Sequence, residues 1–160
     1  MKVVSNTGPL IALAKVDRLD LLKSLFGQVL IPSAVQYELL AKAGPETAVL
    51  RRALSDFVQV NAQTVIPSVV ETVTRALDAG EREAVALAYQ EQLPLVMDDR
   101  LGRQAARSLG LTVTGLVGVC VLAKRADLLK SARDTLLAIR QGGYRLADEL
   151  IEAAAQLADE

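Results

Sequence analysis

Histidine is absent from this chain of 160 residues, and cysteine occurs only once. Without histidine the chain can build neither a Ser-His nor a Cys-His catalytic pair, and it has no histidine metal ligand. Cys120 alone can form neither an internal disulfide nor a thiolate zinc site. Its position in an apolar run is typical of a reducing compartment, so we expect a cytoplasmic protein. Any enzymatic chemistry must use carboxylates, hydroxyls, amines or a hard cation.

The sequence also lacks the features of nucleotide-binding, base-stacking, membrane-spanning and secreted proteins. The chain has no glycine-rich dinucleotide or P-loop motif, and aromatic residues make up 3% of it, too few for a platform that stacks bases. No apolar run reaches the roughly 18–20 residues that cross a bilayer, so we expect no membrane partner. The first residues lack a charged segment followed by an apolar stretch, and we expect no secretory signal.

The composition favours one folded unit. Hydrophobic residues make up 51% of the chain, charged residues 23%, and the mean hydropathy is +0.29. This balance supplies one sizeable core and is the opposite of a disordered composition. We therefore predict a single domain over residues 1–160, with a core of about 1–126 and C-terminal helices over about 127–160.

Charge is unevenly distributed although the net charge is only -1. Residues 38–99 carry ten acidic and five basic side chains, whereas residues 100–145 carry nine basic and two acidic ones. The tail, residues 146–160, has five acidic side chains and no basic one. Solvated helix faces explain any single charge. A basic segment after an acidic one is also what an enzyme that binds polyanions through metal ions would have.

Short β-prone runs alternate with longer helical ones along the chain. This alternation predicts a three-layer α/β/α sandwich with a central, mainly parallel sheet. Pro32 and Pro67 are expected to open helices, Gly80 to interrupt one, and Gly110 to end one. The expected strands are 2–5, 29–31, 57–60, 95–97 and 111–113. The main expected helices are 32–42, 46–54, 67–78, 81–92, 100–109, 115–126, 129–140 and 147–158.

Two polar clusters follow apolar strands of the predicted sheet. Ser5-Asn6-Thr7 comes after the first strand and Asp98-Asp99 after the fourth. Ligands of open α/β sheets bind beyond the carboxyl ends of strands, near the point where strand order reverses. Each cluster also suits a tight turn, and Asp99 could cap the next helix. Taken alone, each cluster favours the turn interpretation.

Two glutamates are further candidates. Glu38 borders the apolar stripe of its predicted helix, so it could face a cleft or solvent. Glu81 precedes an apolar run, and Asp78-Ala79-Gly80-Glu81 also fits a helix N-cap with its reciprocal acid. We interpret Glu83 as a helix-start charge. Carboxylates gathered at one sheet edge repel one another unless a cation neutralises them, and Mg²⁺ or Mn²⁺ accepts such an all-oxygen shell. Such an ion can promote attack of water on a phosphodiester, a reaction that needs no histidine.

Several sequence segments resemble motifs of the PIN-domain family, and they occur in the same order over nearly the whole chain. A VapC-like subgroup of uncharacterised prokaryotic PIN proteins is the most similar. The residues that carry the resemblance are 4–15 (VSNTGPLIALAK), 29–32 (VLIP) with Val35 and Glu38, 80–88 (GEREAVALA), 96–105 (VMDDRLGRQA), 115–119 (GLVGV) and 143–145 (GYR).

The resemblance implies a fold, an activity and partners. It implies an α/β/α sandwich and Mg²⁺- or Mn²⁺-dependent cleavage of RNA by an endoribonuclease. It further implies the toxin of a toxin–antitoxin pair, commonly a homodimer held inactive by a small antitoxin protein. A PIN-fold module that is catalytically weak or inactive, and binds RNA or a partner protein, is the alternative. A receiver-like phosphoacceptor domain is disfavoured, because its acidic pair would follow the first strand.

The resemblance also assigns roles to residues. Asn6 occupies the place of the first metal-binding acid, and Thr7 that of a positioning hydroxyl. Glu38 matches the second acid and Asp99 the fourth. Glu81 is preferred to Glu83 as the third, because its 18-residue separation from Asp99 resembles the family's usual gap. Asp98 is an additional carboxylate that could reach the metal or close a turn.

Asn6 departs from the family pattern, because its side chain offers one neutral oxygen where a carboxylate is expected. The loss of a charge weakens a hard-cation site, unless Asp98 compensates. A second feature is the helix expected after Asp99, in which Arg100, Arg103 and Arg107 share one face. We expect this face either to contact RNA phosphates or to be simply solvated.

Overall fold

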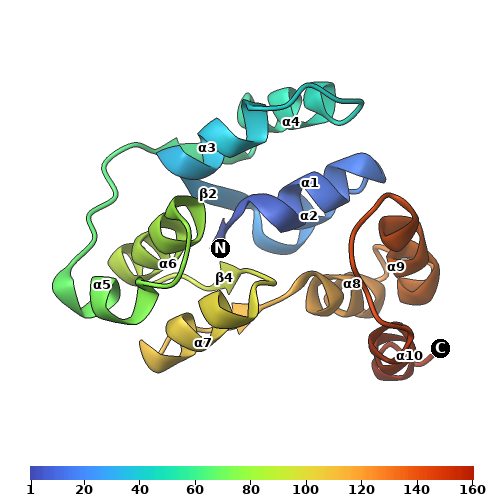
Figure 1. Cartoon of the computed structure of the whole chain (residues 1–160). Helices are drawn as coiled ribbons and strands as arrows, with labels where there is room; N and C mark the ends of the chain where they lie inside the picture. Colours follow the sequence, from blue (N-terminus) through green and yellow to red (C-terminus); the bar gives the residue numbers. More distant parts are fainter.

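A five-stranded parallel sheet forms the centre of the protein in a computed structural model that describes residues 1–160 (Figure 1). The strand order is β3-β2-β1-β4-β5, and all four strand pairings are parallel. This confirms the predicted sheet. The strands are β1 (Lys2–Ser5), β2 (Gln28–Pro32), β3 (Val58–Asn61), β4 (Leu95–Val96) and β5 (Val113–Thr114).

Ten helices connect and follow the strands. None of them is both long enough and apolar enough to span a membrane. They are α1 (Thr7–Lys15), α2 (Asp20–Phe26), α3 (Ser33–Leu40), α4 (Thr47–Leu54), α5 (Ser68–Thr74), α6 (Ala79–Glu91), α7 (Arg100–Ser108), α8 (Leu116–Arg125), α9 (Ala132–Gln141) and α10 (Asp148–Leu157).

The sheet separates two hydrophobic layers. Successive strand residues point to opposite faces, so Val3 and Val29 pack into a cluster of 30 buried residues, while Val4 and Leu30 pack into one of 13. The larger cluster includes residues of α1–α4 and α8–α10, and the smaller one includes residues of α5, α6 and α7. Figure 1 shows these two helical groups on either side of the strands. The predicted three-layer α/β/α sandwich is confirmed.

The order of the strands reverses between β1 and β4. From β1 the chain proceeds outward to β2 and β3, then returns to β4 on the other side of β1. Ser5 is paired with Val96, so Asn6 and the Asp98-Asp99 pair leave the sheet at the same edge. Ligands of open α/β sheets bind at such a reversal.

Some boundaries differ from the sequence-based prediction. Pro32 ends β2, where it pairs with Asn61, instead of opening a helix, because its extended backbone continues the strand. Gly80 was expected to interrupt a helix but is the second residue of α6, since Asp78 caps that helix and starts it at Ala79. The last strand lies at Val113–Thr114 instead of 111–113, and its pairing with β4 fixes that register.

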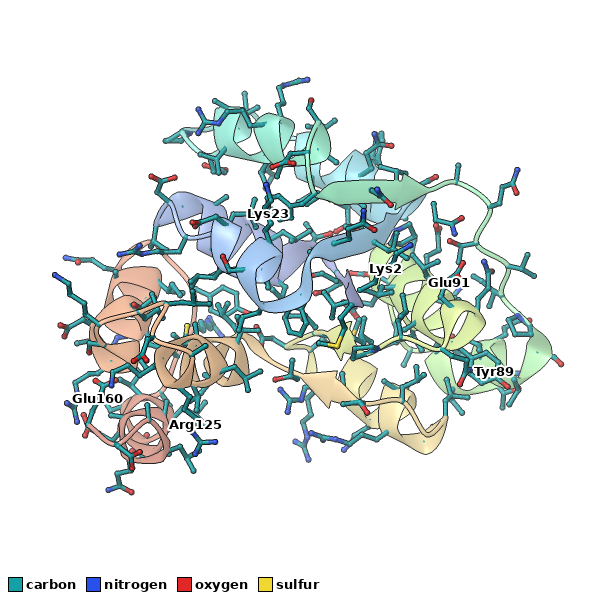
Figure 2. All side chains as sticks on the ribbon, turned by 180° about the vertical axis from the view of Figure 1, so that it is seen from behind. Lys2, Lys23, Tyr89, Glu91, Arg125 and Glu160 are labelled. Carbon is teal, nitrogen blue, oxygen red and sulfur yellow. The ribbon has the colours of Figure 1, made fainter.

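The last three helices form a packed unit beside the sheet. Arg125 at the end of α8 donates two hydrogen bonds to the Leu157 carbonyl, of 3.1 and 2.7 Å. Glu160 accepts a 2.6 Å bond from the Ala132 N–H at the start of α9. Figure 2 labels Arg125 and Glu160 at this end of the molecule. These contacts fix α10 against α8 and α9, and so fix the loop between α9 and α10.

Candidate functional site

A pocket of about 350 Å³ opens at the strand reversal, and we call it the acidic pocket. Five carboxylates line it, and no lysine or arginine does. The sequence-predicted site residues Asn6, Thr7, Glu38, Glu81, Asp98 and Asp99 all lie there. The full lining is Asn6, Thr7, Gly8, Pro9, Glu38, Asp78, Glu81, Asp98, Asp99 and Tyr144.

Asn6 and Thr7 follow β1 without using their side chains for the turn. Asn6 is 9% exposed, makes no side-chain cap bond to α1, and its buried Oδ1 has no hydrogen-bond partner. Leaving a buried acceptor unpaired costs about 1–3 kcal/mol, so such an atom calls for a ligand or a water. The Thr7 hydroxyl donates a 2.9 Å hydrogen bond to Oε2 of Glu38. The two side chains are directed into the pocket region, and turn formation does not explain them.

Glu38 projects from α3 toward the start of α6. A Cβ atom at Gly80 would lie 2.0 Å from Oε1 of Glu38, a distance that no real Cβ tolerates. Only glycine therefore leaves room for the carboxylate here. The expected solvent-facing alternative for Glu38 does not hold, because the side chain is half-buried and fixed between Thr7 and Gly80.

Glu81 lies in the first turn of α6, which Asp78 caps by accepting a 2.9 Å bond from the Glu81 N–H. The pKa of Glu81 is raised from 4.5 to about 7. Burial is the main cause, followed by the hydrogen bond and negative charge of Asp78, and then the charge of Asp99. The carboxylates therefore disfavour one another's charge, which is the situation that a cation relieves.

Asp98 and Asp99 have different partners. Asp99 caps α7, since its Oδ2 accepts a 2.7 Å bond from the Gly102 N–H, and its Oδ1 accepts none. Asp98 uses both oxygens: Oδ1 accepts a 2.9 Å bond from the Leu116 N–H, and Oδ2 accepts one from the Tyr144 hydroxyl. Asp99 thus has a free oxygen at the pocket and Asp98 does not.

The donors in the pocket match a hard divalent cation in type. They are carboxylate and amide oxygens, with no nitrogen or sulfur ligand among them. The unpaired oxygen of Asn6 adds a neutral ligand of the kind that Mg²⁺ and Mn²⁺ accept. No three acidic side chains converge closely enough to coordinate one ion as they lie. Binding therefore requires rotation of side chains such as Glu81.

Helix α7, which carries three arginines, starts directly after the pocket residue Asp99. Arg100 and Arg107 are exposed and Arg103 is half-buried, and all three lie on one side of the helix that Asp99 caps. Arg103 does not line the acidic pocket. It lines an adjacent, larger cavity together with Asp98 and Asp99.

Asp78 and Tyr144 line the site, but the sequence did not single them out for it. The sequence pattern from Asp78 to Glu81 predicted that Asp78 caps a helix, and no other sequence feature indicated a role in the site. Tyr144 comes from the loop after α9, and burial and Asp98 raise its pKa. Glu83 lies outside the pocket, and its carboxylate accepts a 3.4 Å bond from the Ala34 N–H at the start of α3.

The larger cavity, of about 980 Å³, adjoins the acidic pocket, and we call it the apolar groove. It shares Asp98, Asp99 and Tyr144 with the acidic pocket. Its apolar lining includes three exposed leucines, Leu122, Leu150 and Leu157. The remaining lining residues are Arg103, Val113, Thr114, Gly115, Val117, Gly118, Val121, Arg145 and Leu146.

Comparison with known proteins identifies the family. A search of curated proteins gives no match to the chain. A family model described as a PIN domain matches residues 2–160. The match spans β1 to the end of α10 and includes every residue of the acidic pocket. By this match and by its three-layer fold, the chain belongs to the PIN-domain family.

Proposed function

We propose that this protein is an endoribonuclease that cleaves RNA phosphodiester bonds and depends on Mg²⁺ or Mn²⁺. PIN domains are generally nucleases. The observation that carries the proposal is the acidic pocket itself, in which five carboxylates and an unpaired buried amide oxygen line one cavity without a basic side chain. A pocket of this charge repels a phosphodiester unless cations are bound to it.

Four residues would hold the ion, namely Asn6, Glu38, Glu81 and Asp99. When bound, the ion lowers the charge of the pocket, polarises a phosphodiester and promotes attack by water. Thr7 fixes the direction of the Glu38 carboxylate through its hydrogen bond. The cap bond from Gly102 holds Asp99 with one oxygen free. Glu81, with a pKa of about 7, exchanges its proton for a cation at neutral pH with little penalty.

RNA would lie across the start of α7. The helix that Asp99 caps carries Arg100, Arg103 and Arg107, which supply positive charge beside a negative pocket. Each phosphate contact to a single strand contributes about 0.7 to the slope of log K against log salt. Replacing all three arginines with alanine should weaken RNA binding and reduce that slope by about 2. An unchanged affinity and slope would show that this helix face is merely solvated.

Cleavage of a labelled single-stranded RNA with Mn²⁺ tests the activity. Asp99→Ala and Glu38→Ala should each lower the rate about a hundredfold or more, because removing even an outer partner of a metal ligand costs about 10–100-fold. Glu71→Ala, which removes an exposed acid of α5 outside the pocket, is the matched control and should keep the wild-type rate. Cleavage that persists in both pocket variants would refute the assignment.

We further propose that the chain is the toxin of a VapBC-like toxin–antitoxin pair, a homodimer held inactive by a small antitoxin. The apolar groove supports a protein partner, because Leu122, Leu150 and Leu157 remain 43, 51 and 57% exposed beside the acidic pocket. Expression in a prokaryotic host should arrest growth, and Asp99→Ala should relieve the arrest. Arrest by both forms would contradict a toxic nuclease.

A module that binds RNA or a partner without cleaving it is the second candidate. Asn6 favours it, because a neutral side chain stands at the position where the family's first acid is expected. Calorimetry separates the two candidates. If the protein is a nuclease, its heat of Mn²⁺ binding should fall when Glu38 or Asp99 is replaced. If it is only a binding module, replacing these two residues should leave the heat of Mn²⁺ binding unchanged.

A further inference from the structure

Asp98 joins three segments of the chain at the edge of the acidic pocket. It follows β4, its Oδ1 accepts the N–H of Leu116 at the start of α8, and its Oδ2 accepts the hydroxyl of Tyr144 from the loop before α10. Both carboxylate oxygens are thus engaged by protein donors. The neighbouring Asp99 makes one such bond and keeps an oxygen free.

The space around Asp98 is arranged for this contact. A Cβ atom at Gly115 would lie 2.3 Å from Oδ1 of Asp98 and 2.5 Å from a guanidinium nitrogen of Arg103. Glycine therefore allows the Asp98 carboxylate to reach the backbone N–H at the start of α8. A larger residue would collide with Oδ1 of Asp98 and disturb its bond to the Leu116 N–H.

Tyr144 divides the two cavities. It lines both the acidic pocket and the apolar groove, and its hydroxyl lies 3.9 Å from the position of a Cβ at Gly8, at the start of α1. The ring therefore closes one wall of the acidic pocket. Its hydroxyl has a single partner, Asp98, which fixes the ring in that place.

We propose that Asp98 and Tyr144 form a positioning pair that holds the β4–α7 connection, and with it Asp99, against the C-terminal helices, and that Asp98 is not a metal ligand. The inference rests on the proposed nuclease function and assigns the two adjacent aspartates separate tasks. Asp99 contacts the ion, and Asp98 acts through the backbone that leads to Asp99. The loop between α9 and α10 thereby contributes a wall to the active site.

Asp98→Asn discriminates between the two roles. An asparagine can still accept the Leu116 N–H and can donate to the Tyr144 oxygen, so it keeps both contacts while losing the charge. Asp98→Ala loses both contacts, and Tyr144→Phe loses one and keeps the ring. Asp99→Asn is the matched control, because it makes the same change of charge at the adjacent residue.

RNA cleavage, Mn²⁺ affinity by calorimetry and the melting temperature should be measured for each variant. We expect Asp98→Ala and Tyr144→Phe to lower kcat about tenfold while Mn²⁺ affinity changes less than about threefold, and Asp98→Asn to recover most of the lost kcat. Asp99→Asn should weaken Mn²⁺ binding about tenfold or more.

If Asp98→Asn weakens Mn²⁺ binding as much as Asp99→Asn does, Asp98 is a ligand and the positioning role is wrong, while the nuclease function stands. Full activity in Asp98→Ala would also overturn the pair. A wild-type chain that neither cleaves RNA nor binds Mn²⁺ would overturn the proposed function, and this inference with it. The melting temperatures identify any variant that has simply lost its fold, and Asp98→Asn remains the informative variant in that case.

Discussion

The hydroxyl of Thr7 donates a 2.9 Å hydrogen bond to Oε2 of Glu38, and so connects the first turn of α1 with α3. The two residues are 31 positions apart in the chain, follow β1 and β2 respectively, and both line the acidic pocket. The bond fixes one oxygen of Glu38 and leaves the other beside Gly80. The position of the carboxylate is therefore set by a neutral donor, which keeps the pocket free of basic side chains.

Thr7→Val should impair catalysis by releasing Glu38. Valine keeps the shape of threonine but cannot donate, and a hydrogen bond to a charged group is worth about 1.5–3 kcal/mol. Since Glu38 is half-buried, solvent replaces part of that interaction, and we expect a loss of about tenfold in kcat/KM. Thr7→Ser keeps the hydroxyl and should stay near the wild-type rate. Equal rates for the two variants would show that the bond has no catalytic role.

Gly80→Ala should separate activity from stability. Alanine is favoured over glycine within a helix by about 0.5–1 kcal/mol, yet its Cβ would lie 2.0 Å from Oε1 of Glu38. Because that atom is at the end of a flexible side chain, the carboxylate moves and the helix remains. We expect a melting temperature close to that of the wild type, with strongly reduced RNA cleavage and Mn²⁺ affinity.

A second background controls the Gly80 prediction. In Glu38→Ala the space beside Gly80 is empty, so adding Gly80→Ala should change neither Mn²⁺ affinity nor the residual rate any further. A further loss in this background would mean that the methyl group acts on something other than Glu38.

Glu81 should make stability depend on pH in a defined direction. Its pKa in the folded protein is about 7, above the ordinary 4.5, so the folded state binds this proton more tightly than the unfolded state does. The contribution of Glu81 to stability is therefore fully present below about pH 4.5 and is lost as the pH rises through 7. With a chelator present, Glu81→Gln should reduce the fall in melting temperature between pH 5 and pH 8. An identical fall in both proteins would show that Glu81 titrates normally.

The parallel sheet and its functional edge were predictable from local patterns. Two valines before the Ser5-Asn6-Thr7 cluster, and three apolar residues before Asp98, identify buried strands and place polar side chains at their carboxyl ends. The reversal of strand order beside β1 then brings these two ends together. The predicted residues Asn6, Thr7, Asp98 and Asp99 therefore line one pocket, to which α3 and α6 add the predicted Glu38 and Glu81.

Other parts of the site depend on contacts that no local pattern encodes. Gly80 was expected to break a helix, because the sequence cannot show that Glu38 from α3 fills the space beside it. Tyr144 bonds Asp98 across 46 residues and comes from a loop whose own sequence gives only a glycine-rich turn. The sequence shows that Asp98 follows a strand, but only the fold reveals that the Leu116 N–H and the Tyr144 hydroxyl engage its carboxylate.

Asn6→Asp should increase the affinity of the pocket for a cation and lower the stability of the cation-free protein. Asn6 is 9% exposed and its Oδ1 has no hydrogen-bond partner, so a carboxylate in its place joins five other acids in a buried position. With a chelator present, repulsion and burial should lower the melting temperature below that of the wild type. With Mn²⁺ present, the added carboxylate becomes a ligand of the ion. The rise in melting temperature that Mn²⁺ causes, and the cleavage rate, should therefore both exceed those of the wild type. Gln59→Glu makes the same amide-to-acid change on the exposed side of β3 and should leave both responses unaltered. A smaller Mn²⁺ response in Asn6→Asp than in the wild type would mean that Asn6 does not face the ion.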